Sequence, residues 1–167
     1  MKCASLIILS SAMVGLVGCS STPVALAPVG PNPVGGEKLT STGELEVFSN
    51  LAEQSDNENQ GSKDPVWYQY TDYNIYNLQG KRVRHVDNSV GHYEQAPRRV
   101  ALPAGRYLVK AQAKGYLQVE VPITIERGRT TRVHLDDKWN LPADTPKREL
   151  VSLPNGNPVG WRTEDWE

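Results

Sequence analysis

The chain has 167 residues, of which 38% are hydrophobic and 22% are charged, and its formal net charge is -1 at pH 7. A nearly neutral chain has no electrostatic basis for holding a phosphate backbone, so nucleic acid is excluded as an expected partner. The 14 glycines and 12 prolines are typical of a β-rich domain with many turns and irregular tails. Once an N-terminal targeting segment is set aside, the remaining length predicts one domain.

Residues 1–18 are predicted to be a cleaved signal segment. Lys2 supplies a short positive region, and the apolar run from Ala4 to Val17 is too short to span a bilayer. The run ends in Leu16-Val17-Gly18-Cys19, which resembles the lipobox of bacterial lipoproteins. The resemblance implies cleavage before Cys19, diacylglyceryl transfer to its thiol and acylation of the new amine, and two or more acyl chains anchor a protein stably. The alternative is an ordinary secretory signal with an incidental cysteine.

The same resemblance implies a location and settles the cysteine chemistry. The residue after the cysteine is Ser20 rather than aspartate, which in enterobacteria implies sorting to the outer membrane. We therefore expect a lipid-anchored protein of the cell envelope that faces the periplasm. Cys3 would leave with the signal and Cys19 would carry lipid, so the mature domain would have no disulfide, no cysteine zinc site and no cysteine nucleophile.

Residues 19–43 are predicted to be the lipidated cysteine followed by a flexible linker. The stretch from Ser20 to Gly43 is rich in proline, glycine and other small residues. Proline removes backbone donors and glycine adds entropy, so we expect no strand ladder here. A mixed coil of this length reaches on the order of 25–30 Å on average.

Residues 44–137 are predicted to form the folded domain. Its first half contains short alternating or aromatic runs, which favour strands, separated by polar loops. The predicted strands are 44–49, 66–70, 72–78, 82–86 and 98–102, and the predicted loops are 51–63 and 87–97. The two aromatic runs form either one bent strand or two strands. Gln79-Gly80-Lys81 is a tight turn, so 72–78 and 82–86 are expected to pair as a hairpin.

The most regular alternation lies between Leu102 and Leu135. Odd positions are mainly apolar or small and even positions polar, and a side-chain period of two buries one face of a sheet. Gly115 and Arg127-Gly128-Arg129 interrupt the pattern, which predicts three consecutive antiparallel strands. The positions expected to face the core are Tyr107, Val109, Ala111, Ala113, Leu117, Val119, Val121, Ile123, Ile125, Thr131, Val133 and Leu135.

Three motifs in this stretch resemble a known family. Leu102-Pro103-Ala104-Gly105-Arg106-Tyr107, Ala113-Lys114-Gly115-Tyr116 and Val121-Pro122-Ile123-Thr124-Ile125 are similar to the core of the PEGA and carboxypeptidase-regulatory-like modules. The similarity covers residues 44–136. It implies an all-β fold, a small antiparallel Greek-key β-sandwich of the prealbumin (transthyretin) type.

Residues 138–167 are predicted to be an irregular C-terminal tail that contains tryptophan and proline. Residues 150–153 and 159–161 have the composition of short strands around a Pro154-Asn155-Gly156-Asn157 turn. Trp161 is expected to pack back on the sandwich, and the alternative is a tail that docks a partner.

Two groups of side chains are candidates for contact with a ligand or partner. Trp67, Tyr68, Tyr70, Tyr73 and Tyr76 are close in sequence, and only alternate residues of a strand share a face, so some rings must lie outside the core. Exposed rings suit sugar stacking or protein contact. A locally basic region, suited to phosphate or an anionic polymer or else simply an exposed strand face, is formed by Arg98, Arg99 and Arg106 with Lys81, Arg82 and Arg84. The candidate contact residues are Trp67, Tyr68, Tyr70, Tyr76, Arg98 and Arg99.

The sequence carries no catalytic signature. His85 and His134 are expected on exposed strand faces, without the spacing of a zinc site, and Asp136-Asp137 is expected to be a soluble strand edge. No Gly-x-Ser-x-Gly elbow occurs. We therefore expect no metal, no cofactor and no enzymatic activity.

These observations predict a non-catalytic envelope lipoprotein. Lipid at Cys19 would attach it to the membrane, and the β-sandwich would serve protein interaction or structural support, with an unidentified envelope protein or cell-wall partner. The alternative function is a glycan- or cell-wall-binding module that uses exposed tyrosine and tryptophan residues.

Overall fold

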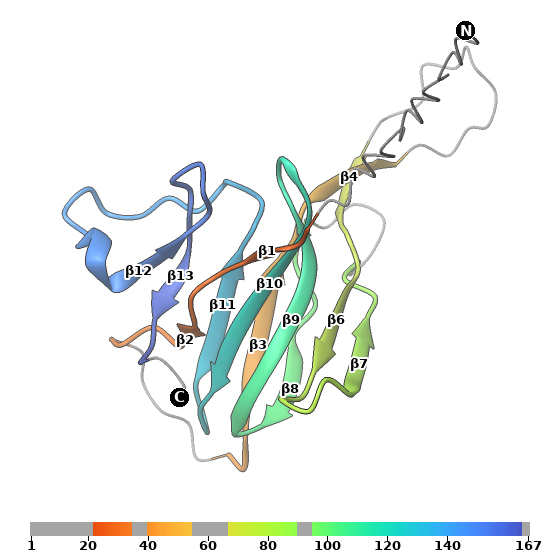
Figure 1. Ribbon diagram of the computed structural model, residues 1–167, viewed down its shortest axis with the longest axis vertical. Helices are drawn as coiled ribbons and strands as arrows, with labels where there is room; N and C mark the ends of the chain where they lie inside the picture. Colours follow the sequence, from red (N-terminus) through yellow and green to blue (C-terminus); the bar gives the residue numbers. More distant parts are fainter. Residues whose placement is uncertain (1–21, 35–39, 55–66, 90–94, 165–167) are drawn as a thin grey trace, which may run out of the picture.

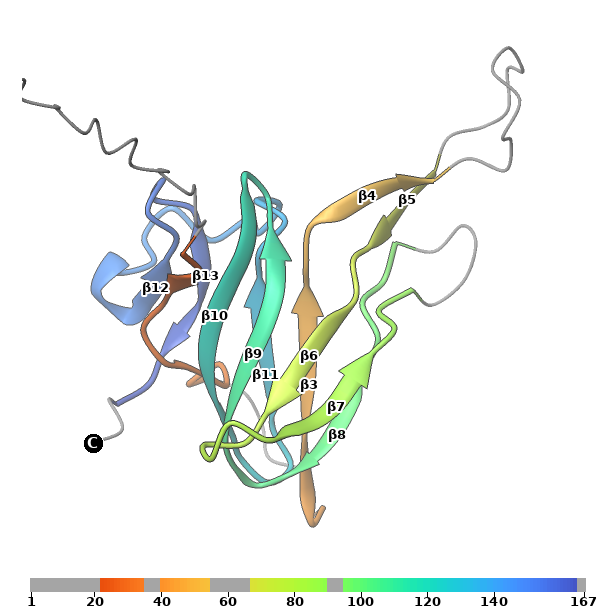
Figure 2. The same ribbon diagram turned by 45° about the vertical axis from the view of Figure 1, so that its right-hand side comes forward.

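The computed structural model describes residues 22–34, 40–54, 67–89 and 95–164. Within them the chain folds as two sheets that face each other, with a two-stranded ribbon at one end (Figures 1 and 2). The expected all-β sandwich is therefore confirmed. The predicted signal segment, Cys19, and parts of the predicted loops 51–63 and 87–97 lie outside the described residues.

The larger sheet contains strands from both ends and the middle of the chain. In spatial order its strands are β12 (Leu150–Ser152), β13 (Pro158–Arg162), β2 (Val29–Gly30), β10 (Tyr116–Ile125), β9 (Gly105–Ala113), β6 (Tyr73–Tyr76) and β7 (Arg82–Val86). A further short strand, β1 (Val24–Ala25), also pairs with β10. The antiparallel β9–β10 pair is the longest in the molecule's described part and forms the centre of this sheet.

The smaller sheet packs against the larger one. Its strands, in spatial order, are β11 (Thr130–His134), β3 (Thr42–Phe48) and β8 (Val100–Pro103). The ribbon consists of β4 (Leu51–Gln54) and β5 (Trp67–Tyr70), so part of the predicted loop 51–63 is in fact a strand. A short 3-10 helix, η1 (Lys147–Glu149), precedes β12.

The pairing of β11 corrects the prediction of three consecutive antiparallel strands. β9 and β10 form the expected hairpin, but β11 crosses to the smaller sheet and pairs in parallel with β3. The alternation is preserved because both sheets turn their inner faces to the same core. A period of two therefore reports which face is buried and not which strand lies alongside.

The core follows the predicted parity at most positions, and the departures are Leu117, the half-buried Tyr107 and the buried even-numbered His134. The odd positions of β10 and β11, from Val119 to Val133, are buried, and so are those of β9 from Val109 onward. Leu117 was predicted to be buried but is 77% exposed. The register shifts between Tyr116 and Val119, and this irregularity at the start of β10 breaks the alternation.

The N-terminal segment corrects the prediction of a linker without a strand ladder. β1 and β2 pair in parallel with β10, and Val29 is fully buried. The amide of Leu26 donates to the carbonyl of Glu120 at 2.9 Å. Each paired stretch has only two residues, and the prolines lie outside both: Pro23 precedes β1, Pro28 lies between the strands, and Pro31 and Pro33 follow β2. The prolines therefore limit the length of each pairing without preventing it.

The C-terminal segment joins the larger sheet through the N-terminal segment. β12 and β13 form a hairpin, as the sequence predicted, and β13 pairs antiparallel with β2. A Cβ on Gly160 would collide with the side chain of Val29, so glycine permits this close approach. The ring of Trp161 lies edge-on to Trp139 at 6.0 Å, which agrees with the expectation that the segment packs back on the sandwich.

The predicted aromatic strands are two strands in different sheets. β5 belongs to the ribbon, whereas β6 pairs with β7 and β9 in the larger sheet. The β6–β7 hairpin is confirmed. In its turn Gly80 has φ +75°, and the Oδ1 of Asn77 accepts hydrogen bonds from the amides of Gln79 and Lys81. Tyr73 and Ile75 face the core from β6.

Candidate functional site

Polar side chains gather where the margins of the two sheets meet. β7 is the last strand of the larger sheet, and β8 is the last strand of the smaller one. An open groove of about 500 Å³ separates β7 from the start of β8, and its lining includes Arg84, Arg98 and Arg99. Three guanidinium groups at one groove favour contact with anionic groups, because arginine forms charge-assisted hydrogen bonds with carboxylates and phosphates.

β7 is unusually exposed for a strand of the larger sheet. Arg82, Val83, Arg84 and His85 are all exposed, and only Val86 is buried. In the described part of the chain, no strand pairs with the outer side of β7. An edge strand with an unpaired side is a template for another strand, and its charged side chains disfavour pairing with a copy of itself.

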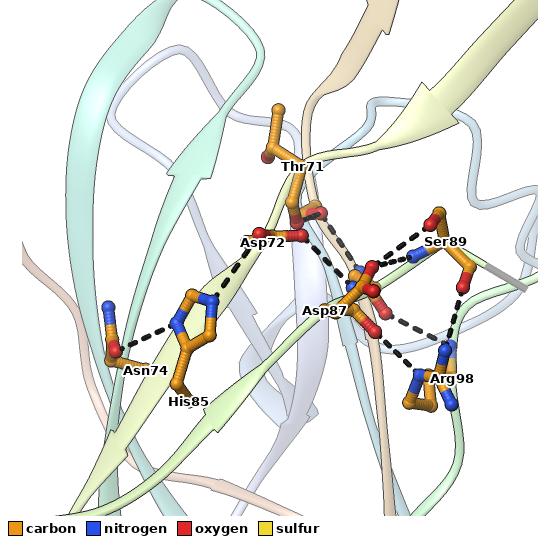
Figure 3. Close-up of polar contacts among 9 residues, drawn as sticks. Thr71, Asp72, Asn74, His85, Asp87, Ser89 and Arg98 are labelled. Carbon is orange, nitrogen blue, oxygen red and sulfur yellow. Dashed lines mark hydrogen bonds and ion pairs between the residues drawn. The ribbon is translucent and has the colours of Figure 1, made fainter.

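His85 lies on this edge between two acceptor oxygens. Its Nδ1 is 3.2 Å from Oδ1 of Asn74, and its Nε2 is 3.4 Å from Oδ2 of Asp72 (Figure 3). Both His85 and Asp72 are about half exposed. Because both ring nitrogens face these oxygens, neither is directed at a serine hydroxyl as the base of a nucleophile–base pair would be.

Asn88 attaches the segment after β7 to the smaller sheet. This side chain is fully buried. Its Nδ2 donates to the carbonyl of Val47 at 2.8 Å and to Oγ of Ser49 at 3.0 Å. Its Oδ1 accepts from the amide of Arg98 at 2.9 Å. The hydrogen bonds of one buried amide therefore hold both walls of the groove in place.

Arg98, a predicted contact residue, is used in holding this segment. Its Nε donates to the carbonyl of Asp87 at 2.6 Å, and its Nη2 donates to the carbonyl of Ser89 at 2.9 Å (Figure 3). The Oδ1 of Asp87 accepts from the hydroxyl of Ser89 at 2.9 Å and from its amide at 3.3 Å, and these hydrogen bonds lower the pKa of Asp87. The Ser89 hydroxyl is therefore occupied as a donor.

Arg99, the other predicted arginine, forms part of an ion-pair cluster. Glu46 is buried, and its two oxygens accept from Nε of Arg99 at 2.5 Å and Nε of Arg132 at 2.7 Å. Burial alone would raise the pKa of Glu46, but the hydrogen bonds and charges of Arg132 and Arg99 lower it below its usual value. Arg99 is itself well exposed, so it can hold Glu46 and still line the groove.

A buried tyrosine lies close to the charges of the groove. Tyr73 is 1% exposed, and no group of the described residues accepts from or donates to its hydroxyl. Burial raises the pKa of Tyr73 strongly, and the positive charges of Arg84 and Arg98 oppose that rise. Tyr73 on the inner face of β6 is therefore close enough to Arg84 and Arg98 for their charges to act on its hydroxyl.

The predicted aromatic group does not form one surface. Tyr70 and Tyr73 are buried, whereas Tyr68 on the ribbon is 44% exposed. Trp67 is half-buried on the same ribbon strand. Tyr76 is half-buried on β6 in the larger sheet. The structure thus separates the candidates Trp67, Tyr68 and Tyr70 on the ribbon from Tyr76, Arg98 and Arg99 on the sandwich.

Tyr70 and Tyr76 each have an interaction partner. The hydroxyl of Tyr70 donates to Oδ2 of Asp136 at 3.1 Å. Asp136 is 3% exposed, so its predicted place on a soluble strand edge is wrong. Nζ of Lys110 lies 5.2 Å from the ring centroid of Tyr76, which is within the range of a cation–π contact. These contacts give both rings a role in packing.

The sequence did not predict an aromatic stack that the structure forms around His134. His134 was expected on an exposed face but is 8% exposed. Its ring stacks between Phe48, at 4.2 Å, and Trp139, at 4.5 Å. Burial lowers the pKa of His134 to about 4. Trp139 lies beyond the end of β11, in a stretch without periodicity, so strand alternation contained no signal for this stack.

The described residues contain no candidate metal site. Among the described residues, no group of three or more His, Cys, Asp and Glu side chains is placed to hold a metal ion. Over the same residues, no helix has the length and apolar character needed to cross a bilayer.

Comparison of the chain with models of protein families, with curated proteins and with solved structures finds no match.

Proposed function

We propose that this chain is a non-catalytic, lipid-anchored β-sandwich of the cell envelope that binds a protein partner through the β7–β8 groove. The observation that carries the proposal is the exposed edge strand β7 beside a groove lined by Arg84, Arg98 and Arg99. An extended segment of a partner can add to an exposed sheet edge by main-chain hydrogen bonds. The arginines favour a segment that carries acidic side chains.

The anchor belongs to the same proposal. It is supported by Leu16-Val17-Gly18-Cys19 after an apolar run, a pattern that resembles the lipobox. We propose diacylglyceryl attachment at Cys19 and a place on the periplasmic side of the outer membrane. Substitution Cys19→Ala is expected to move the protein from the detergent-soluble envelope fraction to a soluble or unprocessed form. Retention of the variant in the membrane at its processed size would contradict the anchor.

A relationship to the PEGA and carboxypeptidase-regulatory-like modules, with their Greek-key prealbumin topology, is also part of the proposal. Its support is local. Pro103 to Gly105 joins β8 to β9, and Gly115 takes φ +82° in the β9–β10 turn. These are the places at which the resembling motifs require a turn and a hairpin glycine.

The alternative function, a glycan- or cell-wall-binding module, has weaker support. The exposed Tyr68 and the half-buried Tyr76 lie on different sheets, and Lys110 already contacts Tyr76. Sugar binding by stacking uses flat rings that are free of other contacts. The edge strand and its arginines therefore favour the protein partner.

Photocrosslinking in intact envelopes tests the proposed groove. A photoreactive residue replaces Val83, which is exposed on β7, and a control replaces Arg148, which is exposed on η1. We expect the probe at Val83 to capture a protein that the probe at Arg148 does not capture. The additional change Arg84→Glu is expected to reduce that capture, and so is high salt, because the contact is charged.

Two results would contradict the groove. One is the same set of captured proteins from Val83 and Arg148. The other is undiminished capture from Val83 after Arg84→Glu. Because Arg84 lies on an exposed edge strand, the charge reversal Arg84→Glu is expected to leave the folded structure intact. Circular dichroism of the purified variant verifies this.

A further inference from the structure

One end of the sandwich combines the start of the described chain with an exposed apolar turn. Thr22 and Val24 line a small pocket together with Gly115, Tyr116 and Leu117 of the β9–β10 turn. Val24 pairs with Val119 of β10, so the first described residues are held at this end by the sheet. Figures 1 and 2 both show the β9–β10 turn at the end of the sandwich from which the ribbon extends.

The chain between Cys19 and this end is short. Thr22 follows Cys19 by three positions in the sequence. An extended chain spans at most ~3.3–3.6 Å per residue, so the separation is at most about 11 Å. The pairing of β1 with β10 therefore replaces the long reach of a free linker. A lipid on Cys19 would hold this end of the sandwich beside the bilayer surface.

The turn has the composition of a membrane contact. Leu117 is 77% exposed, although leucine at a strand position normally faces a core. Tyr116, beside it, is half-buried, and Gln118 is exposed. Lys114 on the other side of the turn pairs with Asp137 at 3.0 Å. An apolar tip with a polar surround suits the boundary between headgroups and acyl chains, where tyrosine is also favoured.

We propose that the β9–β10 turn is a membrane-contact site, and that Leu117 inserts into the surface of the bilayer that holds the lipid anchor. This inference rests on the proposed lipidation of Cys19. It gives the sandwich a defined orientation, because β6 runs antiparallel to β9 and the β6–β7 turn therefore lies at the opposite end. That turn carries Leu78, which is 55% exposed and points away from the membrane in the proposed orientation.

The two leucines provide a matched pair for the test. Leu117→Cys and Leu78→Cys are made separately in the full chain, and each is labelled with a fluorophore that responds to polarity. The lipidated proteins are purified and placed in vesicles of phosphatidylethanolamine and phosphatidylglycerol. Accessibility is measured with acrylamide in the water phase and with lipids brominated on the acyl chains. The same labelled chains without residues 1–18 and with Cys19→Ser give the reference without an anchor.

We expect acrylamide to quench the label at position 117 several-fold less in the anchored protein than in the reference, and brominated lipid to quench it. The label at position 78 is expected to behave alike in both. In addition, Leu117→Asp is expected to restore acrylamide access to a label at Gln118→Cys. Leu117 is exposed, so this substitution disturbs no core contact.

Equal accessibility of positions 117 and 78 in the anchored protein would overturn the membrane contact. The lipid itself is checked independently by the mass of the purified protein and by its flotation with vesicles. If the protein carries lipid on Cys19 and both labels are accessible, the proposed anchor is supported and only the proposed membrane contact of Leu117 is contradicted. A protein without lipid on Cys19 would overturn the anchor and the contact together.

Discussion

Residues 105–125 and residues 22–34 both contribute strands to the larger sheet, but their sequences differ in kind. The first region alternates apolar and polar side chains, and its strands are long. The second is rich in proline and has two strands of two residues each. Val29 is nevertheless as fully buried as Val121. Composition thus predicts how long a strand can be, whereas burial depends on where the segment docks.

The two regions differ in how far away in the sequence their partner strands lie. β10 pairs with β9, its neighbour in sequence, over most of its length, so the signal for this hairpin is local. β1 and β2 are stabilised by pairing with β10, which is distant in sequence, together with contacts such as the hydrogen bond from Arg129 to the carbonyl of Asn32. Short segments with little strand propensity can therefore complete a sheet that other strands have built.

The largest expected effect is the loss of stability when a buried side chain of β10, in the region of regular alternation, is truncated. Ile123 is fully buried in β10, and Ile123→Ala should lower the free energy of unfolding by about 2–5 kcal/mol through lost burial and a cavity. Gln118, exposed on the same strand, is the control, and Gln118→Ala should cost within about 0.5 kcal/mol. Urea denaturation of both variants measures the difference. Equal costs would show that both faces of β10 are buried.

A smaller effect concerns His134, which joins the smaller sheet to the C-terminal segment. Its pKa in the folded protein is about 4, below the ordinary 6.5, so folding favours the neutral ring. The contribution of the neutral His134 ring to the free energy of unfolding is fully present above pH 6.5. It is lost as the pH falls from 6.5 toward 4, because the unfolded chain takes up the proton first, and the loss is at most about 3 kcal/mol. Arg132 lowers this pKa further, whereas Glu46 opposes the shift.

The variant His134→Phe keeps a ring between Phe48 and Trp139 but cannot be protonated. Its unfolding free energy should fall less than that of the unsubstituted protein between pH 6.5 and 4. Urea titrations at several pH values provide the comparison, and carboxylates that titrate in both proteins cancel. Parallel pH profiles would show that His134 is free to take up a proton in the folded state.

The next prediction addresses the proline-rich region directly. Val29 is fully buried and Val34 is 88% exposed, although only five positions separate them. Val29→Ala should cost about 1–3 kcal/mol, and Val34→Ala should be within about 0.5 kcal/mol of neutral. Thermal or urea unfolding measures both. If the two variants were equally stable, residues 22–34 would act as a tether and the contrast with β10 would be lost.

The smallest expected effect is the absence of glycan binding. The separation of Tyr68 from Tyr76 leaves no shared platform, so the soluble domain should not sediment with purified peptidoglycan above background. A Tyr76→Ala variant should behave in the same way as the unsubstituted domain. Saturable sedimentation that disappears in a folded Tyr76→Ala variant would support the glycan-binding alternative instead of the protein partner.

The candidate site could be predicted from the sequence only in part. Arg98 and Arg99 were identified, and both line the groove between β7 and β8. Their structural roles toward Asp87 and Glu46 were not predicted, because these partners are separated from them in sequence and meet through the fold. Arg84 belongs to the same groove because β7 and β8 are the edges of opposite sheets.

The sequence by itself determined the all-β class, the β6–β7 and β9–β10 hairpins and most of the buried face of residues 107–135. These features depend on side-chain alternation and on turns such as Gly80 and Gly115, which are local properties of the chain. Only the tertiary structure decided that β11 pairs with β3, that residues 24–30 complete the larger sheet, and that His134 is buried. Each of these depends on which distant segment supplies the neighbour, and a side-chain period carries no information about partners.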